Sequence, residues 1–222
     1  MNDFNAIFQL CEAIGTAAFA VSGAMVAIDK GTDIFGVLLM AVFTALGGGT
    51  LRDVLIGHFP PRMFTNFHYV LLSCICALTV FILARSLKER YIERERLIEQ
   101  VNNVFDAIGL GIFAVSGARI GMEAGFADNI FLTTFLGTTT AIGGGMLRDV
   151  LVREVPTVLR RELYAVPALI GATIVVVASV LDHRGAAAAI AGAMVCFLIR
   201  MVGLRFGLGL PTAPSERDKP DG

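Results

Sequence analysis

The stretch "GGGTLRD" occupies residues 47–53, and "GGGMLRD" occupies residues 143–149. Both lie inside long apolar runs. Glycine weakens an α-helix by about 1 kcal/mol relative to alanine, so three in a row predict a break or a kink. Arginine and aspartate are costly inside a membrane and are usually functional there. The doubled stretch raises the question of what two glycine runs and two Arg-Asp pairs do in such apolar segments.

The composition indicates an integral membrane protein. Of the 222 residues, 55% are hydrophobic, and the mean hydropathy is +0.73, whereas soluble domains are about 45–50% apolar. About 20 apolar residues span a bilayer as a helix. We therefore predict an all-α membrane protein with seven transmembrane helices, at about residues 5–28, 34–56, 67–84, 103–122, 129–152, 163–181 and 186–204.

An internal repeat organises the chain. "EAIGTAAFAVSGA" (12–24) matches "DAIGLGIFAVSGA" (106–118), and "TALGGGTLRDVL" (44–55) matches "TAIGGGMLRDVL" (140–151). Each copy holds three predicted spans, and because three is odd, the second copy enters the membrane from the opposite side, which makes an inverted repeat. The predicted units are residues 1–84 (first repeat), 85–102 (charged cytoplasmic linker), 103–181 (second, inverted repeat), 182–210 (seventh helix) and 211–222 (disordered tail).

The distribution of basic residues predicts the orientation. With alternating spans, 4 of the 18 Lys and Arg residues fall on the side of the N-terminus, and the other 14 fall on the opposite side. Because cytoplasmic loops carry the excess of Lys and Arg, the opposite side is predicted to be cytoplasmic. The N-terminus is then outside and the C-terminus is cytoplasmic.

The sequence offers no chemistry typical of an enzyme. Cys11, Cys74, Cys76 and Cys196 lie in predicted helices without metal-ligand spacing, and the three histidines have no partner at such a spacing. The glycine runs lack the Lys-Ser/Thr of a phosphate-binding loop. We expect no enzymatic activity, no metal site, no cofactor and no nucleic-acid partner.

The two glycine runs indicate either a transport path or close helix packing. In lipid, backbone groups freed by a helix break must be satisfied by protein or by water in a cavity. Matched breaks in the two halves of an inverted repeat are typical of a transport site, and this favours the path. The helix C-termini created by such breaks carry partial negative charge, and with the hydroxyls of Thr44 and Thr140 they would suit a small cation.

The charged residues Arg52, Asp53, Arg148 and Asp149 are predicted to lie near this path. They can form structural ion pairs or act in gating and permeation, and the sequence leaves both roles open. Because adjacent residues on a helix do not face each other, each arginine could pair with an acid elsewhere in the chain.

Seven spans, the inverted repeat, "FAVSGA" twice and "GGGxLRD" twice resemble the prokaryotic branch of the trimeric intracellular cation (TRIC) channel family, a membrane domain also linked to glycine uptake. The resemblance covers about residues 5–205. It implies a homotrimer in the bacterial inner (plasma) membrane, among membrane lipids, with one pore per subunit between the kinked second and fifth helices that passes monovalent cations such as K+. The implied pore positions are Thr44, Gly47, Gly48, Gly49, Thr140, Gly143, Gly144 and Gly145.

Two functions remain open at this point: a cation channel, and a carrier for glycine or another small neutral amino acid. The inverted repeat and broken helices suit both. A carrier needs partners for an α-amino and a carboxylate group, and the sequence shows no dedicated charged pair in the middle of its spans. We therefore favour the channel.

Overall fold

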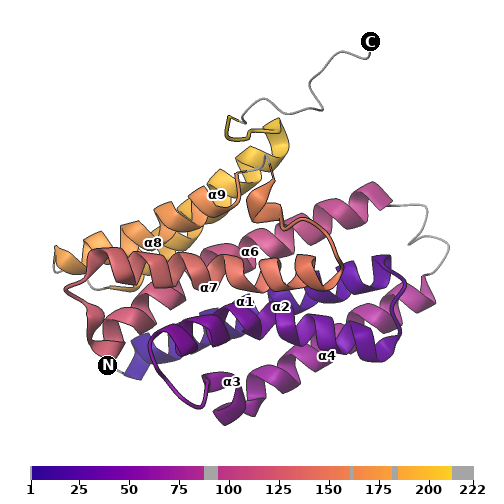
Figure 1. Ribbon diagram of the computed structural model, residues 1–222, viewed down its shortest axis with the longest axis horizontal. Helices are drawn as coiled ribbons and strands as arrows, with labels where there is room; N and C mark the ends of the chain where they lie inside the picture. The colour runs from indigo at the N-terminus through magenta and orange to yellow at the C-terminus, as the bar shows by residue number, and fades with distance from the viewer. Residues whose placement is uncertain (1, 88–94, 161–162, 182–184, 212–222) are drawn as a thin grey trace.

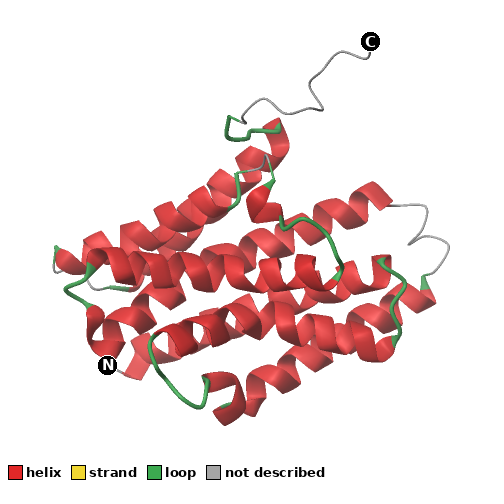
Figure 2. Ribbon diagram, in the orientation of Figure 1, coloured by secondary structure: helices red, strands yellow, loops and turns green. Residues whose placement is uncertain are grey.

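The computed structural model describes residues 2–87, 95–160, 163–181 and 185–211, and these residues contain helices but no strand (Figures 1 and 2). The helices are α1 (Asn2–Asp29), α2 (Ile34–Leu55), α3 (Arg62–Thr65), α4 (Phe67–Ser86), α6 (Glu95–Gly121), α7 (Ile130–Leu151), α8 (Ala165–Val180) and α9 (Ala186–Phe206). A π-helical turn, Met122–Phe126, follows α6, and a 3-10 turn, Thr157–Leu159, precedes α8. Of the predicted tail, residues 212–222 lie outside the described residues.

Each predicted span coincides with one helix, which confirms the all-α membrane class. In the described part of the chain, α1, α2, α4, α6, α7 and α9 are long and apolar enough to cross a bilayer. α8 is equally apolar but has 16 residues, fewer than the about 20 of a typical span. α6 begins at Glu95, so it already starts within the segment predicted as a linker.

The predicted breaks at the glycine runs are absent. α2 and α7 are each continuous α-helices of 22 residues, through residues 47–49 and 143–145 respectively. Glycine lowers helix propensity but keeps its backbone N–H, so unlike proline it removes no helical hydrogen bond. In apolar surroundings, a broken helix would leave backbone N–H and C=O groups without hydrogen bonds. This costs more free energy than the low helix propensity of the three glycines.

The two copies of the sequence repeat form two helix triplets that pack on each other. α1, α2 and α4 contact one another, as do α6, α7 and α8, while α1 packs on α6 and α2 packs on α7. α9 packs on α6 and α8. Equivalent helices run in opposite directions, since α2 runs from right to left in Figure 1 and α7 runs from left to right.

Small residues form the helix contacts, and large apolar residues face outward. The buried core is rich in alanine, for example Ala20, Ala24 and Ala114, which allows helix backbones to approach closely. Phe35 and Phe131, in contrast, are 68% and 79% exposed. An apolar outer surface of this kind suits lipid or a neighbouring subunit.

Candidate ion path and its charged clusters

The glycine runs form the crossing of α2 and α7. A β-carbon at Gly48 would overlap the carbonyl oxygen of Thr140, and one at Gly144 would overlap the carbonyl oxygen of Thr44. The contacts are reciprocal, so the two repeat copies are related by an approximate two-fold axis at this crossing. Only glycine permits this approach, because any other residue would place a side-chain atom on the neighbouring backbone.

Two repeat-equivalent leucines close the crossing on either side. A β-carbon at Gly143 would lie 3.0 Å from Cδ1 of Leu51 and 3.0 Å from the Cα of Gly48. Gly47 is covered in the same way by the side chain of Leu147. The crossing is therefore tightly packed, with backbone against backbone at its centre and a leucine side chain on either side.

Two polar cavities lie on opposite sides of this crossing. The first, of about 500 Å³, is lined by Glu12, Thr16, Arg52 and Tyr69 among others, and we call it the Glu12 cavity. The second, of about 720 Å³, is lined by Met25, Asp106, Arg148, Asp149 and Arg200 among others, and we call it the Asp106 cavity.

Helix α1 lines both cavities, so the distance between them can be measured along it. Thr16 lines the Glu12 cavity, and Met25 lines the Asp106 cavity. At a rise of about 1.5 Å per residue, these two positions lie about 14 Å apart along the helix. The two cavities thus open toward opposite ends of the bundle.

The Asp106 cavity contains a buried charge cluster around Arg148. The Arg148 guanidinium donates through Nη1 to Ser22 Oγ at 2.7 Å and to Asp106 Oδ1 at 2.8 Å, and through Nε to Asp149 Oδ1 at 3.0 Å. The Tyr164 hydroxyl donates to the same Asp106 oxygen at 3.2 Å. All five side chains are buried. The cluster joins α1, α6, α7 and the start of α8, and it leaves Arg148 with two carboxylate partners.

The repeat-equivalent groups in the Glu12 cavity are bonded differently. Arg52 donates through Nε and Nη2 to Asp53 Oδ1, at 3.0 and 2.7 Å. Glu12, which occupies the position of Asp106 in the repeat, instead accepts from Ser116 Oγ at 2.7 Å and from the Tyr69 hydroxyl at 3.3 Å. Its partners are thus neutral hydroxyls rather than a guanidinium.

Asp53 and Asp149 also anchor the chain that follows each helix. The backbone N–H of Arg62 donates to Asp53 Oδ2 at 2.8 Å. The backbone N–H and the hydroxyl of Thr157 donate to Asp149 Oδ2 at 2.7 and 2.9 Å. Each aspartate therefore binds its neighbouring arginine through one oxygen and a post-helix turn through the other.

A salt bridge joins the two repeat copies at the end of the bundle that holds the Asp106 cavity. Lys30 Nζ lies 2.6 Å from Glu154 Oε1, and Arg160 Nη2 lies 2.8 Å from Glu154 Oε2. These contacts hold the pKa of the Glu154 carboxyl below its ordinary value, chiefly through its hydrogen bond with Lys30. They hold the pKa of Lys30 above its ordinary value, chiefly through the hydrogen bond with Glu154.

Comparisons with known proteins agree with this architecture. The family model described as "Glycine transporter" matches residues 9–85 and 103–180, which are the two repeat copies. A solved structure described as "Crystal structure of a prokaryotic TRIC channel in 0.5 M KCl" has a TM-score of 0.83 at 31% identity, and the match covers 93% of this chain and all of that one. The chain belongs to the TRIC family.

Other relatives extend this TRIC-family assignment. The TRIC trimeric intracellular cation channel orthologue from Rhodobacter sphaeroides has a TM-score of 0.81 at 35% identity, and the match covers 91% of this chain and 99% of that one. A UPF0126 membrane protein of Streptomyces coelicolor is 43% identical, over 91% of this chain and 89% of that protein. The UPF0126 inner membrane protein YadS of Escherichia coli K12 is 34% identical, over 90% of this chain and 92% of that protein. The membrane assignment of this chain follows from its apolar helices and from these relatives.

The structure places the predicted pore threonines of this TRIC chain away from both cavities. The Thr44 hydroxyl is buried and donates to the Met40 carbonyl at 2.7 Å, and the Thr140 hydroxyl donates to the Leu136 carbonyl at 2.6 Å. Gly49 lines the Glu12 cavity. The remaining predicted positions, Gly47, Gly48, Gly143, Gly144 and Gly145, are buried at or beside the crossing.

The structure brings the predicted charged residues into ion pairs. Arg52 and Arg148 each bond the aspartate that follows them, against the expectation that adjacent residues on a helix do not meet. The long arginine side chain turns back to reach its neighbour. Arg148 also has the predicted distant acid, Asp106.

Sequence analysis missed the acids that complete both clusters. Glu12 and Asp106 are the first residues of the matched segments "EAIGTAAFAVSGA" and "DAIGLGIFAVSGA". Ser22 and Ser116 are likewise equivalent in those segments. An acid at the same place in both copies, at the edge of an apolar run, was the signal that could have identified them.

Proposed function

We propose that each subunit passes monovalent cations, with K+ the expected ion, from one cavity to the other through the crossing of α2 and α7. The observation that carries this is the pair of repeat-equivalent polar cavities, on opposite sides of the crossing and separated by it. Related structures are described as TRIC cation channels, which supports the class of cargo.

The tight crossing corresponds to a closed path. Leu51 and Leu147 cover the glycines, and the backbones touch at Gly48 and Gly144. Conduction therefore requires α2 and α7 to separate. In the separated state we expect Gly47, Gly48, Gly143 and Gly144 to line the constriction, with the carbonyl oxygens, rather than the hydroxyls, of Thr44 and Thr140 beside them.

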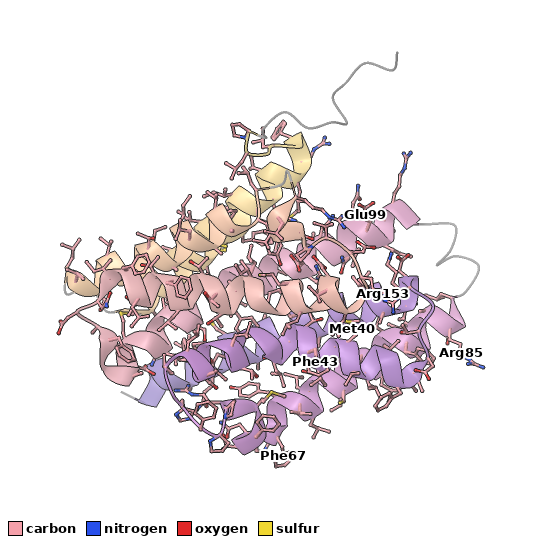
Figure 3. The ribbon with its side chains drawn as sticks, in the orientation of Figure 1. Met40, Phe43, Phe67, Arg85, Glu99 and Arg153 are labelled. Carbon is pink, nitrogen blue, oxygen red and sulfur yellow. The ribbon has the colours of Figure 1, made fainter. Side chains whose placement is uncertain are left out.

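The membrane arrangement that we propose is a seven-span inverted repeat in a homotrimer, with α8 as a short span and lipid around the subunits. The opposite directions of equivalent helices support it (Figure 1), and a related structure is described as trimeric. Arg85, Glu99 and Arg153 lie toward the same end of the bundle (Figure 3). We assign this end to the cytoplasm, because basic residues are more frequent there.

The experiment that tests this function uses purified protein in a planar bilayer with gradients of KCl or NaCl. We expect discrete current steps whose reversal potential follows the K+ gradient. Absence of current in protein that is verifiably inserted would contradict the proposal. A cytoplasm-dependent reporter should be active when fused after Arg205 and inactive when fused before Phe4, and the reverse pattern would contradict the assigned orientation.

A carrier for glycine or a similar amino acid is the second candidate. The family description "Glycine transporter" favours it, and so does the buried Arg148–Asp106 pair. A guanidinium and a carboxylate side by side can bind the carboxylate and ammonium groups of an amino acid, and the sequence had shown no such pair. Saturable counterflow of labelled glycine without current would favour the carrier over the channel.

A further inference from the structure

Because the chain contains an internal repeat, the hydrogen bonds of equivalent residues can be compared between the two cavities. Glu12 is equivalent to Asp106, Arg52 to Arg148, and Ser116 to Ser22. In the Asp106 cavity, the guanidinium of Arg148 bonds both the acid and the serine. In the Glu12 cavity, the equivalent acid bonds the serine itself, and the arginine bonds Asp53 instead.

This difference leaves the Glu12 carboxylate without a cationic partner. Three acids (Glu12, Asp53 and Glu123) and three arginines (Arg52, Arg62 and Arg119) line the Glu12 cavity. Asp53 bonds Arg52, and Glu123 lies 2.6 Å from the Nε of Arg119. Within the described chain, Glu12 accepts only from the hydroxyls of Ser116 and Tyr69. A carboxylate at the wall of a cavity in a low-dielectric surrounding attracts a counter-ion strongly.

The equivalent acid of the other repeat copy, Asp106, does hold a positive charge. In the Asp106 cavity, a guanidinium nitrogen lies 2.8 Å from the acid. The pocket wall around Glu12 offers the same kinds of groups, namely one carboxylate, a serine hydroxyl and a tyrosine hydroxyl. Hydroxyls that donate to Glu12 keep oxygen lone pairs that can coordinate a hard cation.

A residue outside the repeat explains why the two cavities differ. Arg200 of α9 lies over the ring of Tyr164, at 4.8 Å from the ring centroid, and donates to the Leu163 carbonyl at 3.1 Å. Tyr164 in turn bonds Asp106. α9 has no copy in the first half, so this support is specific to the Asp106 cluster and keeps Arg148 on its acid.

We propose that Glu12, supported by Ser116 and Tyr69, is a binding site for a monovalent inorganic cation in the Glu12 cavity, and that Arg52 competes for it. Arg52 does so by turning from Asp53 to Glu12, which is the arrangement that Arg148 already has with Asp106. This deepens the proposed function and rests on it for the role of the site in permeation. No guanidinium is hydrogen-bonded to Glu12, and its single negative charge matches that of one monovalent ion.

The first test compares Glu12→Gln with Glu123→Gln, a control acid in the same cavity that already has an arginine partner. Glu12→Gln should lower the ratio of K+ to Cl⁻ permeability by about threefold or more, because a fixed negative charge is lost from the path. Glu123→Gln should leave it close to wild type. Equal ratios for Glu12→Gln and wild type, in channels that conduct and assemble normally, would overturn the site.

The second test needs no current. KCl, compared with choline chloride at equal ionic strength, should raise the thermal midpoint of the wild-type protein, since a ligand that binds only the folded state stabilises it. Glu12→Gln should abolish this K+-specific shift, and Glu123→Gln should keep it. A shift that persists in Glu12→Gln would overturn the inference. If wild type carries no K+ current, the proposed function fails, while this measurement still decides whether Glu12 binds K+.

The competition by Arg52 has its own outcome. Arg52→Gln removes the competitor, so the K+ concentration that gives half of the thermal shift should fall by several-fold. If that variant does not fold, Arg52→Lys replaces it, because a single ammonium lacks the separate donors with which Arg148 contacts Ser22, Asp106 and Asp149. An unchanged or higher half-saturating concentration would show that Arg52 does not compete.

Discussion

The backbone of Gly48 on α2 lies directly against the carbonyl oxygen of Thr140 on α7, so that a β-carbon at Gly48 would overlap that oxygen. Thr44 and Gly144 make the same contact in the opposite sense. The contact is between backbone atoms, which cannot move aside as a flexible side chain can. The glycine runs are therefore contact points between two intact helices, and a path between α2 and α7 would open only if these helices moved apart.

Substitution within one glycine run separates close packing from helix propensity. Gly48→Ala should lower the thermal stability and the yield of assembled protein, because overpacking of about 1–3 kcal/mol or more exceeds the gain in helix propensity of about 1 kcal/mol. Gly49→Ala is the matched control, because its β-carbon would meet only Nη2 of Arg52, at 3.6 Å. It should be neutral or stabilising. Thermal unfolding in detergent measures both.

The contrary result would be informative. If Gly48→Ala were as stable as wild type, the contact with Thr140 would not limit the packing of α2 on α7. The crossing would then tolerate a wider spacing than the structure shows.

The threonines before the glycine runs should not determine ion preference. The hydroxyl of Thr44 is buried and bonds the carbonyl of Met40 in its own helix. Thr44→Val should therefore lower stability by about 0.5–1.5 kcal/mol, the net value of one hydrogen bond. The ratio of K+ to Na+ permeability should remain unchanged. A shifted reversal potential in a K+/Na+ gradient would instead place this hydroxyl in the open path.

Much of the fold could be predicted from the sequence, because bilayer length and internal similarity are encoded in a single chain. The long apolar runs and the matched segments 12–24 and 106–118 were sufficient to place the helices. The state of the glycine runs could not be predicted in this way. Helix propensity is a local quantity, whereas α2 and α7 remain continuous because each packs against the other.

The candidate site was predicted only in part for a related reason. The Arg-Asp pairs were visible as charges in apolar segments. Their partners, Asp106 on α6 and Ser22 on α1, are 42 and 126 residues away from Arg148. Which acid an arginine meets depends on how the helices pack, and Asp106 bonds Tyr164, which contacts Arg200 of α9, a helix outside the repeat. Neither can be obtained from spacing along one helix.

The bridge between Lys30 and Glu154 should make stability depend weakly on pH. The pKa of Glu154 is lowered from 4.5, so its contribution is present above pH 4.5 and is lost as the pH falls through the lower, folded-state value. The pKa of Lys30 is raised from 10.5, so its contribution is present below pH 10.5 and is lost above the folded-state value. The difference in thermal midpoint between wild type and Glu154→Gln should therefore be constant near neutral pH and vanish in acid.

Both side chains of this bridge are more than one-third exposed, at 39% for Lys30 and 38% for Glu154. The effect should therefore be small and should decrease in high salt. A difference between wild type and Glu154→Gln that persists unchanged into strong acid, or that is insensitive to salt, would mean that the bridge is not its source.

Loss of Arg148 should lower the stability of the protein more than loss of the equivalent Arg52. Arg148→Met leaves two buried carboxylates, Asp106 and Asp149, without their cationic partner. Such a change typically costs about 3–5 kcal/mol. Arg52→Met leaves only Asp53, which keeps its hydrogen bond from the Arg62 backbone N–H, so a smaller loss of thermal stability is expected. Arg205→Met, an exposed position at the end of α9, is the control and should match wild type. Equal losses for Arg148→Met and Arg52→Met would mean that the second carboxylate adds nothing to the Arg148 cluster, and that the two halves are energetically as similar as their sequences.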